Sequence, residues 1–250
     1  MPYQHPPVEL RSGIPLSGSG PLPDASLYPV GALWVYNGEY YKNRIIGSFV
    51  NAATTTKVDY VTNTVVINPN NDFSIDIVFK QDASDSVSHT GLFCCGSATV
   101  SARSIWVERD GYANFYNIRL YNSAGASLAS SLVSFDGLFN KITFKKISGI
   151  IYTYKNNILI GSVDFSSLGL LNQSALTTIG AQQASRTMNG KIACVKYAES
   201  GVVKFHYEFD EGSGSTIFDK SDNGNNGILT DGAPNTFWSN REFVPMSLQC

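Results

Sequence analysis

The sequence predicts an all-β protein: an antiparallel β-sandwich, or jelly roll, with an extended Pro/Gly-rich N-terminal arm. Three observations predict this fold class. Charged residues make up only 15% of the chain, which therefore lacks the Glu, Lys, Ala and Leu enrichment of helical proteins. Apolar and polar residues alternate along short segments, which indicates about ten to thirteen strands. No segment shows the apolar period of an amphipathic helix.

Residues 1–32 form the predicted arm. Seven of the ten prolines fall within the first 29 residues, with Gly and Ser between them. Proline fixes φ and removes a backbone donor, so we expect an extended segment without a core of its own. We also expect this segment to lie on a neighbouring chain and to anchor the protein in an assembly.

Residues 33–49 are expected to form an aromatic hairpin that connects the arm to the sandwich. Asn37-Gly38 suits the positive φ angles of a type I′ turn between two strands. Tyr and Trp are enriched among the residues that dominate the binding energy of protein interfaces. We therefore predict that the aromatic residues of this hairpin are assembly contacts: Trp34, Tyr36, Tyr40 and Tyr41.

Alternation assigns core and surface faces to the strands that follow. In residues 73–80, one face carries Phe and Ile, and the other carries mainly Ser, Asp and Lys. In residues 203–210, the same rule predicts a core face of Val203, Phe205, Tyr207 and Phe209. The opposite face would then carry Lys204, His206, Glu208 and Asp210. Asn156-Asn157 is a second predicted turn, between two further strands.

The order of the segments resembles laminin-G-like, concanavalin A-like lectin domains. The matching segments are NDFSIDIVFK, GLFCCG, RSIWVERDGYANFYNIRL, FNKITFKK, IYTYKNNILIGSV, LTTIGAQQ, MNGKIACVKYAES and YEFDEGSGSTIFDKSDNGNNGIL, followed by Trp238. This resemblance implies a jelly-roll domain over residues 50–250. The glycine-rich run near the end also looks similar to arrangements in bacteriophage structural proteins, such as tail fibres and decoration proteins.

Residues 209–227, FDEGSGSTIFDKSDNGNNG, concentrate acids, glycines and asparagines. They lack the GxxxxGK[ST] pattern of a phosphate loop. Asp219, Ser221, Asn223 and Gly224 match the start of an EF-hand loop, but Thr230 stands where its closing Glu belongs. A calcium site of another kind would use Asp219 and Asp222. The alternative is a turn, in which Gly supplies positive φ and Asp and Asn bond to nearby backbone.

Glu208 and Asp210 raise the hypothesis of a glycan hydrolase. Residues at i and i+2 of a strand lie roughly 6.6–6.8 Å apart, near the separation of paired catalytic acids. The resemblance to β-glucanases on a similar sandwich would require a third acid, where this chain has Gly212 or Ser213. No GxSxG nucleophile elbow is present either. We therefore expect no enzyme.

Charge and hydropathy exclude two classes of partner. The net charge is −2 and the longest basic run is Lys145-Lys146, so we expect no nucleic-acid partner, because phosphate binding needs a basic stripe. No run of 18 apolar residues indicates a membrane span, and the N-terminus has no signal-peptide layout. We expect a protein that is made in the cytoplasm and stays there until lysis.

The four cysteines are predicted to be unpaired, buried thiols: Cys94, Cys95, Cys194 and Cys250. Neighbouring residues of a strand point to opposite faces, so Cys94 and Cys95 should not bridge one another. No CxxC spacing indicates zinc.

These observations support one main hypothesis and two alternatives. Lectin-like domains usually work outside cells, whereas this chain has no export signal. A virion component of a bacteriophage resolves that conflict, with residues 1–32 bound to other virion proteins and the jelly roll displayed for decoration or host-glycan attachment. Such a protein is expected to be a homo-oligomer, with a trimer as one option. The alternatives are a free lectin-like module, with or without calcium, and a hydrolase that uses Glu208 and Asp210.

Overall fold

The structure is a computed structural model of the 250-residue chain. It describes residues 8–9, 15–49, 60–82, 90–96, 100–109, 115–130, 133–134, 136–174, 176–181, 188–230, 237–238 and 241–250. Within these ranges, no helix is long and apolar enough to cross a membrane. The helical segments described are short 3-10 turns: η1 (Ala25–Leu27), η2 (Val100–Ala102) and η3 (Ser166–Leu168).

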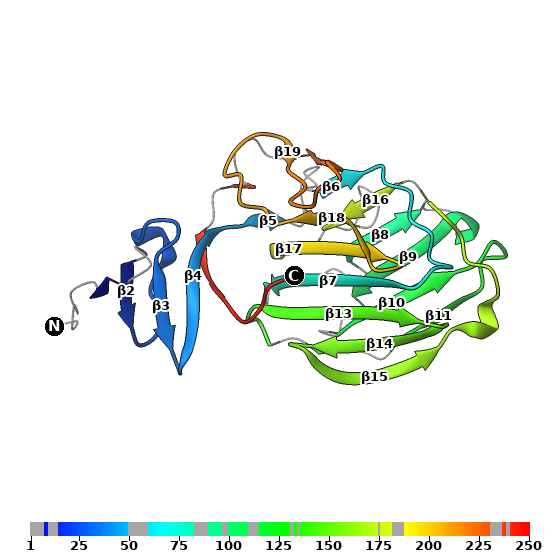
Figure 1. Ribbon diagram of the computed structural model, residues 1–250, viewed down its shortest axis with the longest axis horizontal. Coiled ribbons are helices and arrows are strands. Elements are labelled where there is room, and N and C mark those ends of the chain that lie inside the picture. Colours follow the sequence, from blue (N-terminus) through cyan, green and yellow to red (C-terminus); the bar gives the residue numbers. More distant parts are fainter. Residues whose placement is uncertain are drawn as a thin grey trace.

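Two antiparallel sheets face one another and form the sandwich (Figure 1). The seven-stranded sheet has the order β15 (Ile158–Asp164), β14 (Ile150–Lys155), β13 (Asn140–Ile147), β7 (Phe73–Gln81), β17 (Gly190–Glu199) and β18 (Val202–Tyr207), and β5 (Gly47–Phe49) also pairs with β17. The nine-stranded sheet has the order β11 (Ser127–Ala129), β10 (Phe115–Tyr121), β9 (Arg103–Arg109), β8 (Gly91–Gly96), β16 (Thr177–Ile179), β6 (Tyr60–Asn63), β20 (Gly227–Thr230) and β19 (Thr216–Ile217), and β12 (Val133–Ser134) pairs with β10. The all-β sandwich prediction is confirmed.

The main core lies between these two sheets. The inward face of β7 carries Phe73, Ile75, Ile77 and Phe79, as the alternation predicts. From β18, Phe205 and Tyr207 enter the same core and stack with ring centroids 4.9 Å apart. Val203 is only half-buried, because it lies beside a bulge in the β17–β18 pairing. Burying each large apolar side chain stabilises the fold by about 1.5–3 kcal/mol.

Both predicted asparagine turns are present. Asn37 and Gly38 have φ angles of 52° and 78°, and they join two antiparallel strands of the hairpin. Asn156 and Asn157 have φ angles of 50° and 67°, between β14 and β15. Asparagine and glycine adopt positive φ at low cost, which explains why the chain reverses at these positions.

A separate small sheet lies beside the sandwich, at the left of Figure 1. Its order is β1 (Val8–Glu9), β2 (Pro15–Ser19), β3 (Leu33–Tyr36), β4 (Glu39–Ile45) and β21 (Arg241–Pro245). The small sheet therefore combines part of the predicted arm, the predicted hairpin and a strand from the far end of the sequence. The division of the chain into domains at residues 32 and 49 stays a prediction.

The described part of the arm, residues 15–32, packs on its own chain. β2 pairs in parallel with β3, and Trp34 Nε1 donates a 2.9 Å hydrogen bond to the Gly20 carbonyl. The Trp34 ring also contacts Tyr28, with centroids 5.4 Å apart. Residues 15–19 of the arm are extended, whereas residues 25–27 form a 3-10 turn. The described arm shares a core with the hairpin, because Tyr28 and Trp34 meet. Residues 1–7 and 10–14 lie outside the described residues, and a contact with a neighbouring chain stays a prediction.

Residues 241–250, the C-terminal strap, cross from the small sheet to the outer face of the seven-stranded sheet. β21 pairs antiparallel with β4, and the chain then continues over β7 and β17. Val244 and Leu248 are buried against Val78, Phe139 and other residues of that outer face. The strap therefore forms a second, smaller core outside the sandwich.

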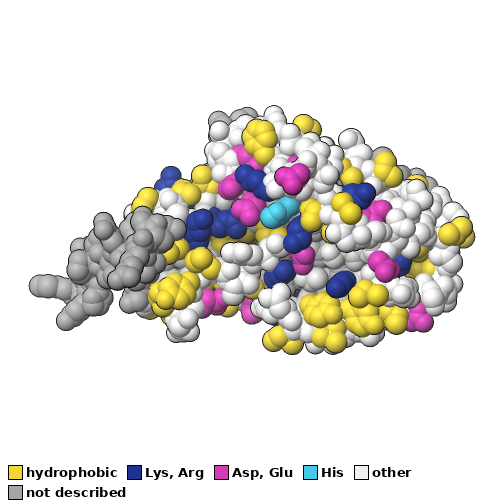
Figure 2. All heavy atoms as spheres, in the orientation of Figure 1, with side chains coloured by type: hydrophobic (Ala, Val, Ile, Leu, Met, Phe, Trp, Pro, Cys, Tyr) yellow, Lys and Arg dark blue, Asp and Glu magenta, His cyan; other side chains and the backbone are white. Residues whose placement is uncertain are grey.

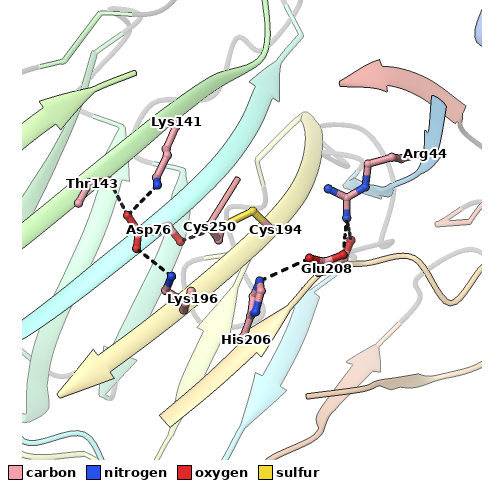
Figure 3. Close-up of a disulfide and its surroundings, with 9 residues drawn as sticks. All are labelled: Arg44, Asp76, Lys141, Thr143, Cys194, Lys196, His206, Glu208 and Cys250. Carbon is pink, nitrogen blue, oxygen red and sulfur yellow. Dashed lines mark hydrogen bonds and ion pairs between the residues drawn. A yellow bond between two sulfur atoms is a disulfide. The ribbon is translucent and has the colours of Figure 1, made fainter. Parts of the chain in front are cut away.

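The strap ends in a disulfide, which corrects one prediction. Cys194 of β17 is bonded to Cys250, with Cα atoms 6.2 Å apart (Figure 3). The prediction of unpaired thiols is wrong for this pair, because the β21–β4 pairing brings the strap onto β17 across a sequence separation of 56 residues. Cys94 and Cys95 are free and buried, as predicted.

Candidate functional site

The glycine-acid run at residues 209–227 closes the free edge of the seven-stranded sheet. β18 is the last strand of that sheet, and its outer edge has backbone groups that no strand pairs. The His206 amide donates to Asp219 Oδ1 at 2.8 Å, and the His206 carbonyl accepts from the Lys220 amide at 2.7 Å. Asn225 Nδ2 reaches the Lys204 carbonyl at 2.8 Å. Side chains and backbone of the run thus take the place of a neighbouring strand.

Asp219 is the acceptor at the centre of this run. Its two carboxylate oxygens receive four hydrogen bonds of 2.7–2.9 Å, from the amides of His206, Ser221 and Asn225 and from the Ser221 hydroxyl. The sequence analysis gave two interpretations of this run, a calcium site and a turn. These hydrogen bonds are those expected of the turn. Asp222 is exposed, and no group of three or more His, Cys, Asp or Glu side chains suited to a metal ion occurs among the described residues. Calcium binding by Asp219 and Asp222 stays a prediction.

Glu208 and Asp210 are each held by a cation. Glu208 Oε2 lies 3.0 Å from Arg44 Nη2, and Asp210 Oδ1 lies 2.9 Å from Lys220 Nζ. Figure 3 shows Glu208 between Arg44 and His206. Burial lowers the pKa of His206, although Glu208 acts in the opposite direction. The two carboxylates therefore serve as ion-pair partners on the outer side of the molecule.

Basic and acidic side chains are interspersed over the face shown in Figure 2. Buried Asp76 accepts a 2.5 Å hydrogen bond from Thr143, and its carboxylate lies 3.4 Å from Lys141 Nζ and 3.8 Å from Lys196 Nζ (Figure 3). Lys141 and Lys196 are therefore both paired with the same acid.

A concave site, the junction cleft, lies between the small sheet and the sandwich. It has a volume of about 380 Å³. It is lined by the β3–β4 hairpin, the C-terminal strap, Leu22 of the arm, Lys80 of β7, and the residues around the start of β13 and between β14 and β15. Its lining includes Tyr36, Glu39, Tyr41, Lys80, Asp136, Leu138, Phe139, Asn140, Asn156, Asn157, Glu242 and Ser247.

Two tyrosines form the aromatic wall of the junction cleft. The rings of Tyr36 and Tyr41 lie 6.4 Å apart between centroids and are tilted by 50°. Tyr41 stands opposite Trp34 on the paired strand, and Tyr36 stands opposite Glu39. Burial raises the pKa of Tyr41, and Glu39 and Tyr36 add to this rise, so its hydroxyl keeps its proton and can donate.

Carboxylates supply acceptors to the cleft. Glu39 Oε1 accepts a hydrogen bond from the Ser247 hydroxyl of the strap. Asp136 Oδ1 accepts from the Leu138 amide at 3.1 Å and from Asn140 Nδ2 at 3.0 Å. Burial alone would raise the pKa of Asp136, but these hydrogen bonds together lower it, so the group stays ionised.

A third carboxylate in the cleft is neutralised. Glu242 Oε1 lies 2.7 Å from Lys191 Nζ, and Glu242 Oε2 lies 3.4 Å from Lys80 Nζ. The Lys80 ammonium also stands 5.9 Å from the centre of the Phe139 ring. This ion-pair group ties the strap to β7 and β17.

The four aromatic residues predicted as assembly contacts divide into different environments. Tyr36 and Tyr41 line the junction cleft. Trp34 packs inside the small sheet against Tyr28 and Phe243. Tyr40 is 52% exposed and does not line the cleft. No partner chain is present, so their role in assembly stays a prediction.

Sequence reasoning missed the acidic and amide residues of the cleft. Glu39 belongs to the predicted hairpin and Asn157 to a predicted turn, so the local sequence indicated the element in which each residue lies. Asp136 and Ser247 carry no such signal, because only the folded chain brings them near Tyr36.

Comparison with solved structures identifies the fold. The chain is similar to a candidate carbohydrate-binding protein from Bacteroides ovatus, with a TM-score of 0.53 and 12% identity over 88% of this chain and 70% of that one. The fold is a concanavalin A-like, lectin-like β-sandwich. The resemblance that the sequence analysis stated is thus confirmed at the level of the fold.

Two further solved structures are less similar to this chain. The binding domain of botulinum neurotoxin serotype G has a TM-score of 0.42 and 13% identity over 65% of this chain and 44% of that one. The serotype D ligand-binding domain in complex with N-acetylneuraminic acid has a TM-score of 0.42 and 11% identity over 62% and 42%. No protein-family model matches the sequence, and no curated protein matches it significantly. None of the three structures named here is a bacteriophage protein.

Proposed function

We propose that this chain is a non-enzymatic glycan-binding module and that the junction cleft is its binding site. The observation that carries the proposal is the presence of Tyr36 and Tyr41 together with three carboxylates in one cleft. A saccharide presents an apolar C–H face and an edge of hydroxyl donors. Aromatic rings suit the face, and a few placed acceptors suit the edge.

The fold supports this proposal without determining it. The candidate carbohydrate-binding protein from Bacteroides ovatus shares the sandwich. Unrelated functions occur on the same fold, so the function must come from the site. The tyrosines and acceptors of the cleft supply that site.

The test is glycan binding by tyrosine variants. A panel of immobilised oligosaccharides would identify a binder, and calorimetry would measure its affinity. Tyr36→Ala and Tyr41→Ala are each expected to weaken binding at least about tenfold, because each removes a contact surface from the centre of the cleft. Tyr40→Ala is the matched control, since Tyr40 lies on the same hairpin outside the cleft.

Two results would contradict the proposal. One is the absence of any binder on a broad panel. The other is a binder whose affinity survives both cleft substitutions but falls in the Tyr40→Ala control.

A bacteriophage virion component is the second candidate function. The observation that favours it is β15, an edge strand with apolar side chains in the open: Ile158 is 70% exposed and Leu159 is 53% exposed. Exposed edge strands that lack Lys and Pro pair readily with another chain. In this alternative the protein is assembled in the host cytoplasm, binds other virion proteins through the arm, and forms homo-oligomers.

The disulfide weakens one premise of that alternative. Unpaired cysteines were expected of a protein kept in the cytoplasm until lysis, and Cys194 is bonded to Cys250. Disulfides persist mainly in oxidising environments, as in secreted proteins. A protein that works outside the cell, either free or on a released particle, agrees with this bond.

Gradient sedimentation of the source lysate separates the two candidates. Comigration of this chain with large particles would favour the virion component, and migration as a small species would favour the free module. The anchoring role would then be tested by deleting residues 1–14 only. Residues 15–32 must stay, because they pack on the hairpin.

The same binding experiment also tests whether calcium is required. Affinity measured with and without a chelator would show whether glycan binding depends on a metal. Loss of binding on chelation, with the same loss in Asp222→Asn when no chelator is present, would assign the metal to the predicted loop.

A further inference from the structure

We propose that the junction cleft selects neutral or amino sugars and rejects acidic ones, and that Glu39 and Asp136 set this preference. The inference rests on the proposed glycan-binding function and names the ligand class of that site. It follows from the charge of the polar groups that line the cleft and from the hydrogen bonds that those groups can still make to a ligand.

The first step concerns the charge of the cleft wall. Three carboxylates line the cleft, and Lys80 is its one lining cation among the described residues. Lys80 and Lys191 both hold Glu242, so their positive charge is opposed at close range. Glu39 and Asp136 therefore account for most of the charge that an incoming ligand meets.

The second step concerns the partners of those two acids. Glu39 accepts a hydrogen bond from the Ser247 hydroxyl. Asp136 accepts hydrogen bonds from the Leu138 backbone amide and the Asn140 side-chain amide. These donors are uncharged, so they orient the carboxylates without cancelling their charge. The charge of Lys155 also acts on Asp136, and the Lys155 ammonium donates a 2.7 Å hydrogen bond to the Ser134 carbonyl.

The third step concerns hydrogen-bond direction. An ionised carboxylate only accepts hydrogen bonds, and each oxygen has more than one lone pair. A sugar hydroxyl or ammonium group donates and so satisfies it. The carboxylate of a sialic or uronic acid, or a sulfate, cannot donate and is repelled by a like charge. The side-chain amide of Asn157, exposed at the rim, adds both a donor and an acceptor for a neutral sugar.

The experiment uses matched ligands on the full chain. Each neutral oligosaccharide of the panel is presented in its plain form and in a form capped with sialic acid or sulfate, at two salt concentrations. The plain form is expected to bind at least about tenfold more tightly, with a smaller gap at high salt because salt screens the repulsion.

Charge variants assign the preference to the two acids. Glu39→Gln and Asp136→Asn keep the acceptor oxygens that Ser247, Leu138 and Asn140 use, so the fold is expected to persist. Each variant is expected to reduce the ratio of the affinity for the plain oligosaccharide to the affinity for the capped one about fivefold. Asp164→Asn is the control and should leave the ratio unchanged, because it removes an exposed charge outside the cleft lining and keeps the oxygen that accepts from the Ser166 amide.

The outcomes separate this inference from the proposed function. A panel without any binder overturns the proposed function. Binding of capped forms as tightly as plain forms overturns the inference alone and leaves glycan binding intact. A neutral preference that neither acid variant alters overturns the assignment to Glu39 and Asp136. A preference that narrows only in the cleft variants supports it.

Discussion

Single side chains close the outer edge of β18. Asp219 accepts four hydrogen bonds from groups of its own loop and of β18. The Asn225 side chain donates a hydrogen bond to the Lys204 carbonyl. A strand edge that lacks such partners is open to pairing with another chain. The glycine-acid run therefore acts as a structural cap for β18.

Replacing Asp219 should destabilise the fold. Asp219→Ala leaves amides of His206, Ser221 and Asn225 without their acceptor, and a lost hydrogen-bond acceptor costs about 1–3 kcal/mol, more when the acceptor is charged. We expect the free energy of unfolding in urea to fall by about 2–4 kcal/mol. Asp222→Ala should change it by less than about 0.5 kcal/mol, and an equal effect of the two substitutions would contradict the cap.

His206 should make stability depend on pH. Burial lowers its pKa, and Glu208, Lys196, Asp219 and Arg44 are the charged groups that act on it. A lowered pKa means that the unfolded chain binds more protons than the folded chain below about pH 6.5. The stabilising contribution of neutral His206 is therefore present above that pH and is lost as the pH falls towards the folded-state pKa.

The expected result is a flatter pH profile for His206→Gln. Between pH 7.5 and 5, the wild-type protein should lose more unfolding free energy than this variant. Urea midpoints measured across that range check the prediction. Parallel profiles would show that other groups carry the pH dependence.

At the scale of elements, Asn43 ties the arm to the small sheet. It is fully buried on β4, and its Nδ2 group faces the carbonyls of Ala25, Tyr28 and Pro29 at 2.9–3.1 Å. One buried side-chain amide thus binds the carbonyls of a turn whose own side chains are mostly exposed. The arm segment over residues 25–31 depends on this contact.

Asn43→Asp should loosen the arm without unfolding the sandwich. The substitution keeps the side-chain shape but replaces the donor with an acceptor that faces three carbonyls. Amide hydrogen exchange within residues 25–32 should accelerate by about tenfold or more, while exchange in β7 and β17 stays unchanged. Asn157→Asp is the control, and uniform acceleration through both sheets would contradict a local role.

The elements themselves follow largely from local sequence. The core face of β7 and the turns at Asn37-Gly38 and Asn156-Asn157 appear where alternation and turn chemistry predict them. Both signals depend on residues within a few positions of one another. The parallel pairing of β2 with β3 is different, because nothing in a Pro/Gly-rich segment specifies which strand it joins.

At the scale of the whole molecule, the strap holds the small sheet against the sandwich. It contributes buried Val244 and Leu248, the Glu242 ion pairs and the bond from Cys250 to Cys194. It also supplies Ser247 and Glu242 to the junction cleft. The disulfide therefore supports both the stability of the fold and the shape of the cleft.

Removing the disulfide should lower stability. The bond closes a loop across 56 residues of sequence, for which chain-entropy arguments give a stabilisation of about 4 kcal/mol. Cys194→Ser and Cys250→Ser are expected to lower the thermal midpoint to the same value. Dithiothreitol should bring the wild-type protein to that value and leave both variants unchanged; a response of the variants to reductant would contradict the pairing.

Local patterns were sufficient to predict an all-β sandwich, the core faces of its strands and its asparagine turns, because period-two alternation and positive-φ residues act over a few positions. They were insufficient for the disulfide and the candidate site. Tyr36, Asp136, Asn157 and Ser247 are far apart in the chain, and they meet because β21 pairs with β4. Such long-range pairing depends on the total burial of apolar surface, which no short segment of the sequence encodes.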